Sequence, residues 1–335
     1  MTAGPIAATP DGALPIGGTL RPFRLARDLG GVAKLIDRAF AGESAEDRLT
    51  RRDVIALRLA APFIGAASVV LPAARDLFAG FVWERDGAIV GNVSIGRLSG
   101  DVTRWMIGNV AVDPAYRRAG IARQLTAAAL DEIERRGGLI AVLDVRADNE
   151  PAYALYRSLG FVTIDRVVDL RRPARRERRT VPPRVRPLRA REWRSLAALL
   201  DAATPALVRR YTPVQEQQVM AMAVSAGLGI AGRLVTGVQS AILVIERDGR
   251  LAGAVEIEIR GGKAPHRLKL TVHPAARGAV EADLVAAALA LLPRGAVRAE
   301  VRAEERPAAE ALAQAGFVVV RTLDRLAIAL RPLEP

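Results

Sequence analysis

A loop containing arginine and glycine lies between a predicted strand and a predicted helix, and its residue types suit phosphate binding. The strand covers Asn109–Val112, and the loop after it contains Arg117, Arg118, Gly120 and Ala122. The first N–H groups of a helix have no partner within the helix, and they lie at the positive end of its dipole. Gly120 allows the backbone to approach a ligand closely, and Ala122 keeps the first helical turn free of bulk. The sequence therefore predicts an anion-binding turn, although a glycine before a helix can equally mark a plain turn.

A second motif follows about 30 residues after this loop. The segment Asn149–Phe161 reads NEPAYALYRSLGF and fits N-x-x-A-x-x-L-Y-x-x-x-G-F, while the loop fits R-x-x-G-x-A. In this order the two motifs resemble the acetyl-CoA loop and the following helix of the GNAT (Gcn5-related) N-acetyltransferases. The resemblance implies an enzyme that uses acetyl-CoA as acyl donor. It also implies acetyl transfer to a primary amine of a small molecule or of a peptide N-terminus.

The resemblance gives each matching position a role in cofactor binding. The pantetheine arm is expected to pair with the strand backbone, and the loop is expected to hold the pyrophosphate. Asn149 is expected to bond the arm, although an asparagine before a helix is equally a plain N-cap. The implied cofactor-binding residues are Val110, Ala111, Val112, Arg117, Arg118, Ala119, Gly120, Ile121, Ala122 and Asn149.

Tyr156 is the catalytic residue that the resemblance implies. A phenol with a pKa of about 10 can return a proton to a thiolate of similar basicity, which is the task of a general acid here. Taken alone, a tyrosine at this spacing is more often a core residue with a hydrogen-bonded hydroxyl group. The motif lacks a general base, because the strand before the loop has no carboxylate. Glu84 on a neighbouring strand could act through water, or it could be a solvated residue beside a turn.

The apolar periodicity and the resemblance together predict an α/β (α+β) fold, with a mixed and mostly antiparallel twisted sheet flanked by helices. Asp28 is the expected N-cap of the first helix. The first expected strand begins near Leu20. The others cover Leu77–Glu84, Ala88–Leu98, Trp105–Val112, Leu139–Val145 and Phe161–Leu170. The expected helices cover Asp28–Phe40, parts of 41–78, the stretch from the loop to Arg136, and Glu150–Leu159.

The second half of the chain repeats the first. Arg186–Arg189 matches Arg21–Arg24, Glu246–Gly249 matches Glu84–Gly87, and Arg302–Ala308 lies 156 positions after Arg146–Ala152. In the second copy Val280 stands where Gly120 stands in the first, and Glu281 follows it. A branched side chain there hinders the approach of a phosphate, and a carboxylate is expected to repel it. Tyr156 maps to Leu312 and Asn149 maps to Glu305, so the second copy is predicted to have lost the chemistry.

These observations predict two tandem GNAT-like domains. A mobile tail is expected at 1–18, a cofactor-competent domain at 19–172, a basic linker at 173–184 and a degenerate domain at 185–333. The second domain is expected to pack on the first, to cover its substrate side or to pair subunits as a homodimer. The tandem arrangement partly resembles mycothiol synthase, in which the C-terminal copy is implied to catalyse. Asn149–Phe161 also resembles the corresponding segment of ribosomal-protein N-terminal acetyltransferases.

The composition argues against nucleic-acid binding, a metal site and membrane contact. The net charge is +13, but Arg171–Arg184 holds seven arginines and one glutamate, which is +6 of that charge, and aromatic residues are only 4%. Nucleic-acid binding is therefore not the expected function. The chain has no cysteine and two histidines, so no metal site is expected. No apolar run approaches 18 residues, and a cytoplasmic protein without membrane contact is expected. The alternative to an enzyme is a non-catalytic acyl-CoA-sensing or nucleic-acid-binding module with the same fold.

Overall fold

The structure is a computed structural model that describes residues 17–40, 79–98, 101–175, 180–228, 239–261 and 264–332. The predicted helical region at 41–78 and nearly all of the predicted tail at 1–18 lie outside the described residues. The described chain forms two compact units. The first contains the described parts of Met1–Gly96 with Met106–Gly137, and the second contains those of Arg97–Trp105 with Gly138–Pro335.

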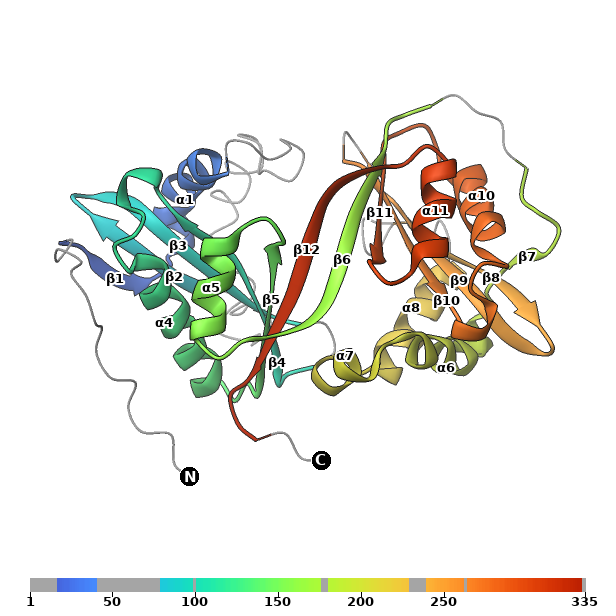
Figure 1. Cartoon of the computed structure of the whole chain (residues 1–335), viewed down its shortest axis with the longest axis horizontal. Coiled ribbons are helices and arrows are strands. Elements are labelled where there is room, and N and C mark those ends of the chain that lie inside the picture. The colour runs from blue at the N-terminus through green and yellow to red at the C-terminus, as the bar shows by residue number, and fades with distance from the viewer. Residues whose placement is uncertain are drawn as a thin grey trace. The chain divides into compact units, whose positions relative to one another are not determined.

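The elements from β2 to β6 recur in the same order as those from β8 to β12, as the sequence repeat predicts (Figure 1). The first half contains β1 (Thr19–Pro22), α1 (Leu25–Ala39), β2 (Ala79–Arg85), β3 (Ala88–Arg97), β4 (Arg104–Val112), the 3-10 turn η2 (Pro114–Tyr116), α4 (Ile121–Arg135), β5 (Ile140–Arg146), α5 (Glu150–Ser158) and β6 (Val162–Arg172). The second half contains β7 (Val185–Pro187), η3 (Ala190–Glu192), α6 (Trp193–Ala203), α7 (Ala206–Tyr211), α8 (Glu216–Leu228), β8 (Gln239–Arg247), β9 (Arg250–Ile259), β10 (His266–Val272), η4 (Pro274–Ala276), α10 (Glu281–Leu291), β11 (Val297–Arg302), α11 (Arg306–Gln314) and β12 (Val318–Ala329).

Helices α1 and α4 pack on opposite faces of the β1-β2-β3-β4 sheet in the first unit. Val82 of β2 belongs to a core with Val32 and Leu35 of α1. Successive residues of a strand face opposite sides, and the next residue, Trp83, lies on the side of α4. A side chain at Gly91 of β3 would come within 2.9 Å of Ile121 and Leu125 on α4. This close contact fixes the first turn of α4 against the sheet, directly after the predicted phosphate loop.

Helix α1 begins three residues before its predicted N-cap. Arg24 is the N-cap residue, and Asp28 lies in the first turn, where its carboxylate accepts a hydrogen bond from the Arg24 N–H at 2.7 Å. The carboxylate is buried and also accepts two hydrogen bonds from the Arg21 guanidinium, at 2.7 and 2.8 Å. The prediction of Asp28 as N-cap is therefore wrong, because its carboxylate caps the helix from within the first turn.

The two halves exchange their last strands within the second unit. The strand order there is β5-β12-β6-β11-β10-β9-β8-β7, so β12 lies between β5 and β6, and β6 lies between β12 and β11 (Figure 1). Strand β12 runs antiparallel to β5, from Leu323 opposite Arg146 to Ala329 opposite Ile140. It runs antiparallel to β6 on its other side. Each half thus receives a strand from the other, and the compact units do not follow the predicted division at 173–184. That division into two domains stays a prediction.

Buried carboxylates hold the exchanged strands. Asp324 of β12 is 3% exposed and accepts a hydrogen bond of 2.6 Å from Arg166 Nε on β6. Asp169 of β6 is 1% exposed and accepts hydrogen bonds from Arg298 Nε at 2.7 Å and from Arg321 Nε at 3.0 Å. Removing one member of such a buried pair is strongly destabilising, because the other charge is left uncompensated. These pairs therefore fix the register between β6, β11 and β12.

Two of the seven arginines near the predicted linker belong to β6. Arg171 and Arg172 are the last residues of that strand. Arg172 is buried and donates a hydrogen bond from Nε to the carbonyl oxygen of Ala315 at 2.8 Å. The basic run Arg171–Arg184 thus begins inside the sheet, before the predicted linker at 173–184, and the aliphatic stem of Arg172 is packed there. Residues 176–179 lie outside the described part of the chain.

The sheet of the second half carries a core on each face. One core joins β8, β9, β10 and β11 to α10 and α11, and the other joins β8 and β9 to α6 and α8. Alternate residues of β8 show the two faces, since Leu243 and Ile245 belong to the first core and Ile242 and Val244 to the second. Among the described residues, no helix is long and apolar enough to span a membrane. The same residues contain no group of three or more potential side-chain metal ligands.

Candidate active site

The turn after β4 is fixed by three bonds to Asp113. Its N–H donates to the carbonyl oxygen of Val90 at 2.9 Å, and its Oδ1 accepts from the Ala115 N–H at 3.1 Å. Its other oxygen, Oδ2, lies 2.9 Å from the Arg38 guanidinium on α1. His273 lies 160 positions after Asp113 and takes its place in the second half. Its Nδ1 accepts a hydrogen bond from the Ala275 N–H at 3.2 Å. The entry to the loop is therefore built in the same way in both halves.

The predicted phosphate loop ends in a left-handed glycine at the start of α4. Gly120 is the N-cap residue with φ +77°, and no side chain caps the helix. Arg118 also has a positive φ, +67°, which is uncommon for a residue other than glycine. Gln124 N–H donates to Gly120 O at 3.1 Å and closes the first turn. The N–H groups before Gln124 in this turn have no intrahelical acceptor, so they are suited to an anion.

Space around Gly120 is open, as a ligand-binding loop requires. A side-chain carbon placed at Gly120 would meet no atom of the described chain within 4 Å. Arg117 Nε lies 3.4 Å from Val112 O, and its NH2 group lies 3.2 Å from Ala39 O. The guanidinium is exposed and bonded only to neutral carbonyl groups in these two contacts. Its positive charge is not neutralised by them and remains at the rim of the loop.

The backbone of β4 changes direction just before the predicted cofactor strand. Asn109 has φ +51°, in the left-handed region that asparagine adopts more readily than most residues. The side-chain amide of Asn92, which is 1% exposed, donates to Asn109 O at 2.9 Å. This buried bond fixes the irregular backbone immediately before Val110–Val112. Neither Asn92 nor Asn109 was predicted as a site residue from the sequence, although asparagine is depleted in strands and two asparagines in adjacent strands are a signal.

Asn149 and Tyr156 lie on α5 in the second unit, whereas the strand and loop candidates lie in the first unit. Asn149 is the N-cap of α5, and its Oδ1 accepts from the Ala152 N–H at 3.2 Å. Asn149 therefore caps α5, as one of its two expected roles predicts. Because the cap uses the carbonyl oxygen, the amide NH2 group keeps its two donors for a ligand.

Tyr156 has a buried ring, but its hydroxyl group has no hydrogen-bond partner within the described chain. The ring is 6% exposed and makes an edge contact with Phe161, with 5.8 Å between the ring centroids. Tyr153 on the same helix differs, because its hydroxyl group lies 3.0 Å from Thr163 Oγ1. Burial raises the pKa of Tyr156 to about 12, so its phenol keeps its proton at neutral pH. A protonated phenol is the form that a general acid needs.

Glu84 is part of a structural ion-pair network. Its carboxylate accepts from Arg21 Nε at 2.6 Å and from Arg27 NH2 at 2.7 Å. The second half repeats the arrangement, with Arg186 bonded to Glu192 at 2.8 and 2.9 Å and to Glu246 at 2.8 Å. Both oxygens of the Glu84 carboxylate are therefore engaged by arginine side chains and are not free to accept a proton from a substrate amine. This network favours the structural alternative for Glu84.

The corresponding loop of the second half is filled by its own carboxylate. Glu281 is 3% exposed, and its oxygens accept from the Gly278 N–H at 2.8 Å and from the Val280 N–H at 3.1 Å. Val280 has φ −131°, in contrast to the left-handed Gly120 that it replaces. The sequence predicted only that this carboxylate repels phosphate. In the structure it also accepts hydrogen bonds from the loop N–H groups that a phosphate would need.

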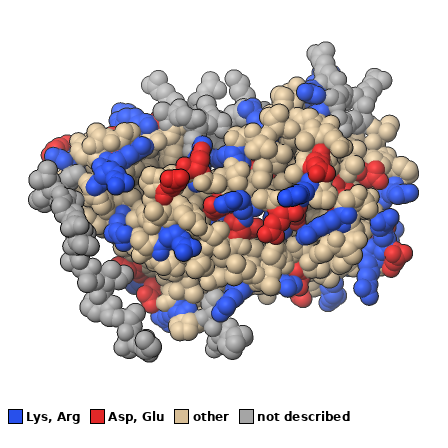
Figure 2. Space-filling model, viewed as in Figure 1, with Lys and Arg blue, Asp and Glu red and all other residues tan. Residues whose placement is uncertain are grey.

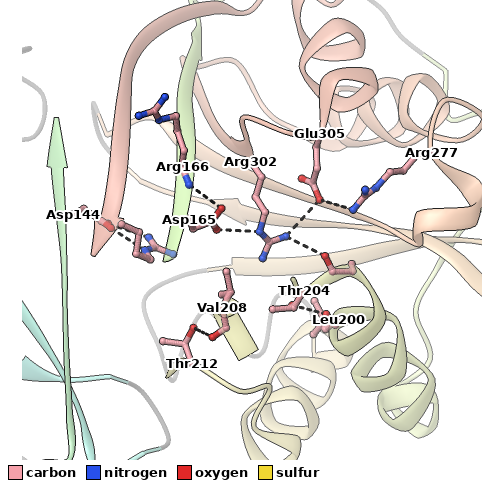
Figure 3. Close-up of polar contacts among 12 residues, drawn as sticks. Asp144, Asp165, Arg166, Leu200, Thr204, Val208, Thr212, Arg277, Arg302 and Glu305 are labelled. Carbon is pink, nitrogen blue, oxygen red and sulfur yellow. Dashed lines mark hydrogen bonds and ion pairs between the residues drawn. The ribbon is translucent and has the colours of Figure 1, made fainter. Parts of the chain in front are cut away.

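Further ion pairs bridge the second half near this loop, as Figure 3 shows. Arg302, at the end of β11, lies between Asp165 of β6 and Glu305, with Nε 3.0 Å from Asp165 Oδ2 and NH1 3.5 Å from Glu305 Oε1 (Figure 3). Arg277, after η4, lies 3.6 Å from the same oxygen of Glu305. Glu305 stands at the position of Asn149, and the buried Leu312 stands at that of Tyr156. The second half therefore has the ion-paired Glu305 and the apolar Leu312 where the first half has the hydrogen-bond donors of Asn149 and Tyr156.

Residues 62–161 match the model of the acetyltransferase (GNAT) family. This segment belongs to the GNAT family. It contains the loop at 117–122 and helix α5, so the resemblance deduced from the two motifs is confirmed. Ribosomal protein bS18-alanine N-acetyltransferase of Escherichia coli is 53% identical over 53 residues, which cover 16% of this chain and 36% of that protein. Mycothiol acetyltransferase of Brachybacterium faecium is 33% identical over 155 residues, which cover 45% of this chain and 43% of that protein. The chain thus spans less than half the length of either protein.

Two solved structures resemble the whole described fold. A GCN5-related N-acetyltransferase from Sphaerobacter thermophilus has a TM-score of 0.65 at 16% identity, over 95% of this chain and 98% of that one. A tandem GNAT protein from the clavulanic acid biosynthesis pathway has a TM-score of 0.57 at 17% identity, over 95% of this chain and 100% of that one. Identity this low supports a statement about the fold alone. The predicted tandem fold with a mostly antiparallel sheet is confirmed.

Proposed function

We propose that this protein is an acetyl-CoA-dependent N-acetyltransferase whose GNAT segment in the first half is active. The observation that carries the proposal is the start of α4: a left-handed Gly120 with open space around it, uncapped N–H groups and the exposed Arg117. A pyrophosphate fits such a turn because the N–H groups and the helix dipole both favour negative charge. Val110–Val112, Arg117–Ala122 and Asn149 are the proposed cofactor-binding residues.

The proposed reaction is a direct attack of an amine on the thioester. Bound acetyl-CoA supplies the activated acyl group. A backbone N–H near Val110 stabilises the negative charge that develops on the carbonyl oxygen as the amine attacks. As the carbon–sulfur bond breaks, Tyr156 donates its proton to the departing sulfur, and its raised pKa keeps that proton in place beforehand. The proton that the amine nitrogen loses on forming the amide passes to water and restores the phenol. Glu84 is not part of the proposal, because its carboxylate is held by two arginines.

One cofactor site per chain is proposed, in the first half. The supporting contrast is between Ile121, the first residue of α4, and Glu281, which stands at the same place in the second half. Ile121 is apolar and buried, so it leaves the loop N–H groups of the first half to a ligand. In the second half the Glu281 carboxylate accepts from Gly278 and Val280 and competes with a phosphate for the same donors.

The proposed acceptor is a primary amine. The relatives named above are an alanine N-acetyltransferase of a ribosomal protein and a mycothiol acetyltransferase, which supports both a peptide α-amine and a small-molecule amine. A cytoplasmic location and a homodimer stay predictions. The face shown in Figure 2 has acidic side chains among the basic ones. This face lacks the continuous basic surface that a nucleic-acid backbone prefers.

The proposal is tested by thiol release from acetyl-CoA with a panel of peptide N-termini, small-molecule amines and aminoglycosides. Tyr156→Phe is expected to lower kcat about 10²-fold while the affinity for acetyl-CoA stays nearly unchanged, because only proton donation is removed. Tyr153→Phe is the matched control on the same helix, since its hydroxyl group bonds Thr163. An unchanged kcat in Tyr156→Phe would show that the proton comes from water.

The rival function is a non-catalytic acyl-CoA-sensing module with the same fold. It predicts that acetyl-CoA binds tightly and that no amine in the panel releases thiol above the rate of spontaneous hydrolysis. Release that depends on the amine and is lost in Tyr156→Phe excludes this rival.

A further inference from the structure

Six charged residues form a regular grid on one face of the second half. In the register of β9, β10 and β11, one row contains Glu258, Arg267 and Arg298, and the next row contains Glu256, Lys269 and Glu300. These residues and Leu268 line a cavity of about 160 Å³. The residues between them in sequence, such as Ile257 and Ala299, belong to the core beneath α10 and α11. The grid therefore lies on the opposite face of the sheet.

The charges of this grid are incompletely paired, in contrast to those of the Arg186 cluster. Arg298 is held by Asp169 through two hydrogen bonds, but Glu256 has Lys269 Nζ only at 3.8 Å. The Oε2 atom of Glu258 is buried without a hydrogen-bond donor, although Arg260 Nε lies 3.4 Å away. Within the described chain, Arg267 and Glu300 have no hydrogen bond and no ion pair within 4 Å, although Glu300 acts electrostatically on Arg325 at longer range. The Arg186 cluster, by contrast, is closed by bonds of 2.8 to 2.9 Å.

One acceptor of this site, the buried Glu258 Oε2 atom, is costly unless a ligand supplies a donor. A buried acceptor without a donor loses its hydration and gains nothing in return. Burial also raises the pKa of Glu256, and Lys269 only partly offsets this effect. A positively charged group placed among the carboxylates of Glu256, Glu258 and Glu300 would supply the missing donor. An anionic group on the same ligand would meet Arg267, whose guanidinium can bind a carboxylate with two parallel hydrogen bonds.

The dimensions of the grid select the ligand class. The two rows are two residues apart along each strand, which is about 7 Å. This distance suits an ammonium and a carboxylate attached to the same carbon atom, with one hydrogen bond at each end. The volume of about 160 Å³ is well below that of sites for cofactor-sized ligands, which are about 300 Å³ or larger. We propose that the charged face of β9, β10 and β11 is a binding site for a free α-amino acid or a close zwitterionic analogue.

The grid is specific to the second half, which supports a role separate from acetyl transfer. Glu256 and Glu258 lie 162 positions after Ser94 and Gly96, so the first half has no carboxylate at either place. The half that carries the grid is also the one whose loop N–H groups are taken by Glu281. A half with a filled phosphate loop and a separate charged cavity is suited to binding a ligand without converting it.

The test is isothermal titration calorimetry of the full chain, without acetyl-CoA, against the individual α-amino acids. Butylamine and butyrate are the probes that carry only one of the two charged groups. At least one amino acid is expected to bind with a Kd below about 1 mM, and each single-charge probe is expected to bind at least about 10-fold more weakly. Because acetyl-CoA is absent, the result does not depend on whether the first half transfers acetyl groups.

The variants Glu300→Gln and Arg267→Gln locate the site. Each is expected to weaken amino-acid binding by about 10-fold or more, because each removes one charge-assisted contact. Both side chains are exposed, so the fold should tolerate the changes. Glu310→Gln and Arg306→Gln, also exposed and located on α11, are the matched controls and should bind as the unaltered chain does. Absence of binding by every amino acid, equal binding of a single-charge probe, or binding unaffected by Glu300→Gln and Arg267→Gln would overturn the proposal.

Discussion

Replacing Gly120 by valine tests the proposed phosphate loop most directly. Gly120 has φ +77° at the N-cap of α4, and a side chain there would meet no neighbouring atom within 4 Å. The expected effect is therefore conformational and not a clash. A branched residue in the left-handed region costs about 1–2 kcal/mol. The chain can instead relax to a negative φ, as Val280 has in the second half at −131°. Relaxation would turn the loop N–H groups away from the ligand.

The loss of cofactor affinity follows from the number of bonds at stake. A hydrogen bond to a charged group contributes about 1.5–3 kcal/mol. Two misdirected N–H groups therefore cost about 3–6 kcal/mol, which weakens acetyl-CoA binding by about 10²-fold to 10⁴-fold. Calorimetry with acetyl-CoA on the full chain measures this change, and thermal unfolding measures the accompanying loss of stability.

Gly137→Val is the matched control. Gly137 follows the C-terminal end of the same helix and has φ +80°. A side-chain carbon placed there would also meet no neighbouring atom within 4 Å. The two variants should lose similar stability, because they carry similar backbone strain. Only Gly120→Val should lose acetyl-CoA affinity. The reasoning fails if Gly120→Val binds acetyl-CoA within about threefold of the unaltered chain, or if Gly137→Val loses as much affinity.

Two further outcomes follow from the second half. Ending the chain at Gly316 removes β12, the shared neighbour of β5 and β6, so gel filtration should show aggregated protein. A chain that ends at Pro332 keeps β12 and should elute normally. If the chain that ends at Gly316 is well folded, the strand exchange is contradicted. Glu281→Gln should lower the free energy of unfolding by about 2 kcal/mol, since an amide offers one acceptor oxygen where the carboxylate offers two. Urea unfolding with the exposed Glu310→Gln as control measures this change, and calorimetry should still find one acetyl-CoA per chain; a second bound acetyl-CoA would mean that Glu281 alone had blocked the loop.

Local patterns made the first half predictable. The helix expected to end at Arg136 runs from Ile121 to Arg135, and the helix expected at Glu150–Leu159 ends at Ser158. Both carry strong local signals: a glycine before the first turn, an asparagine N-cap and apolar residues at helical spacing. The left-handed conformation of Asn109 was not predicted, because it depends on the buried amide of Asn92 in another strand.

The strand exchange was beyond such patterns. The alternating apolar residues of β12 predict a strand, but the same residues could pair within the second half or with β5 of the first. The choice depends on contacts between distant residues, such as Arg166 with Asp324 and Asp144 with Arg325, which are 158 and 181 positions apart. A single sequence does not state these pairings. The predicted boundary at 173–184 was read from proline and arginine content, which reports local chain character and not strand partners.

The two loops of this chain differ in what their backbone N–H groups can bond. Arg118 and Gly278 occupy equivalent positions and share a left-handed φ, +67° and +83°. Two residues later the loops diverge, with Gly120 at +77° and Val280 at −131°. The second loop still places two N–H groups on a carboxylate, supplied by Glu281. The first loop has the apolar Ile121 at that place, so the anion that we propose for it has to come from outside the chain. A ligand with phosphate groups meets this requirement, and acetyl-CoA is such a ligand.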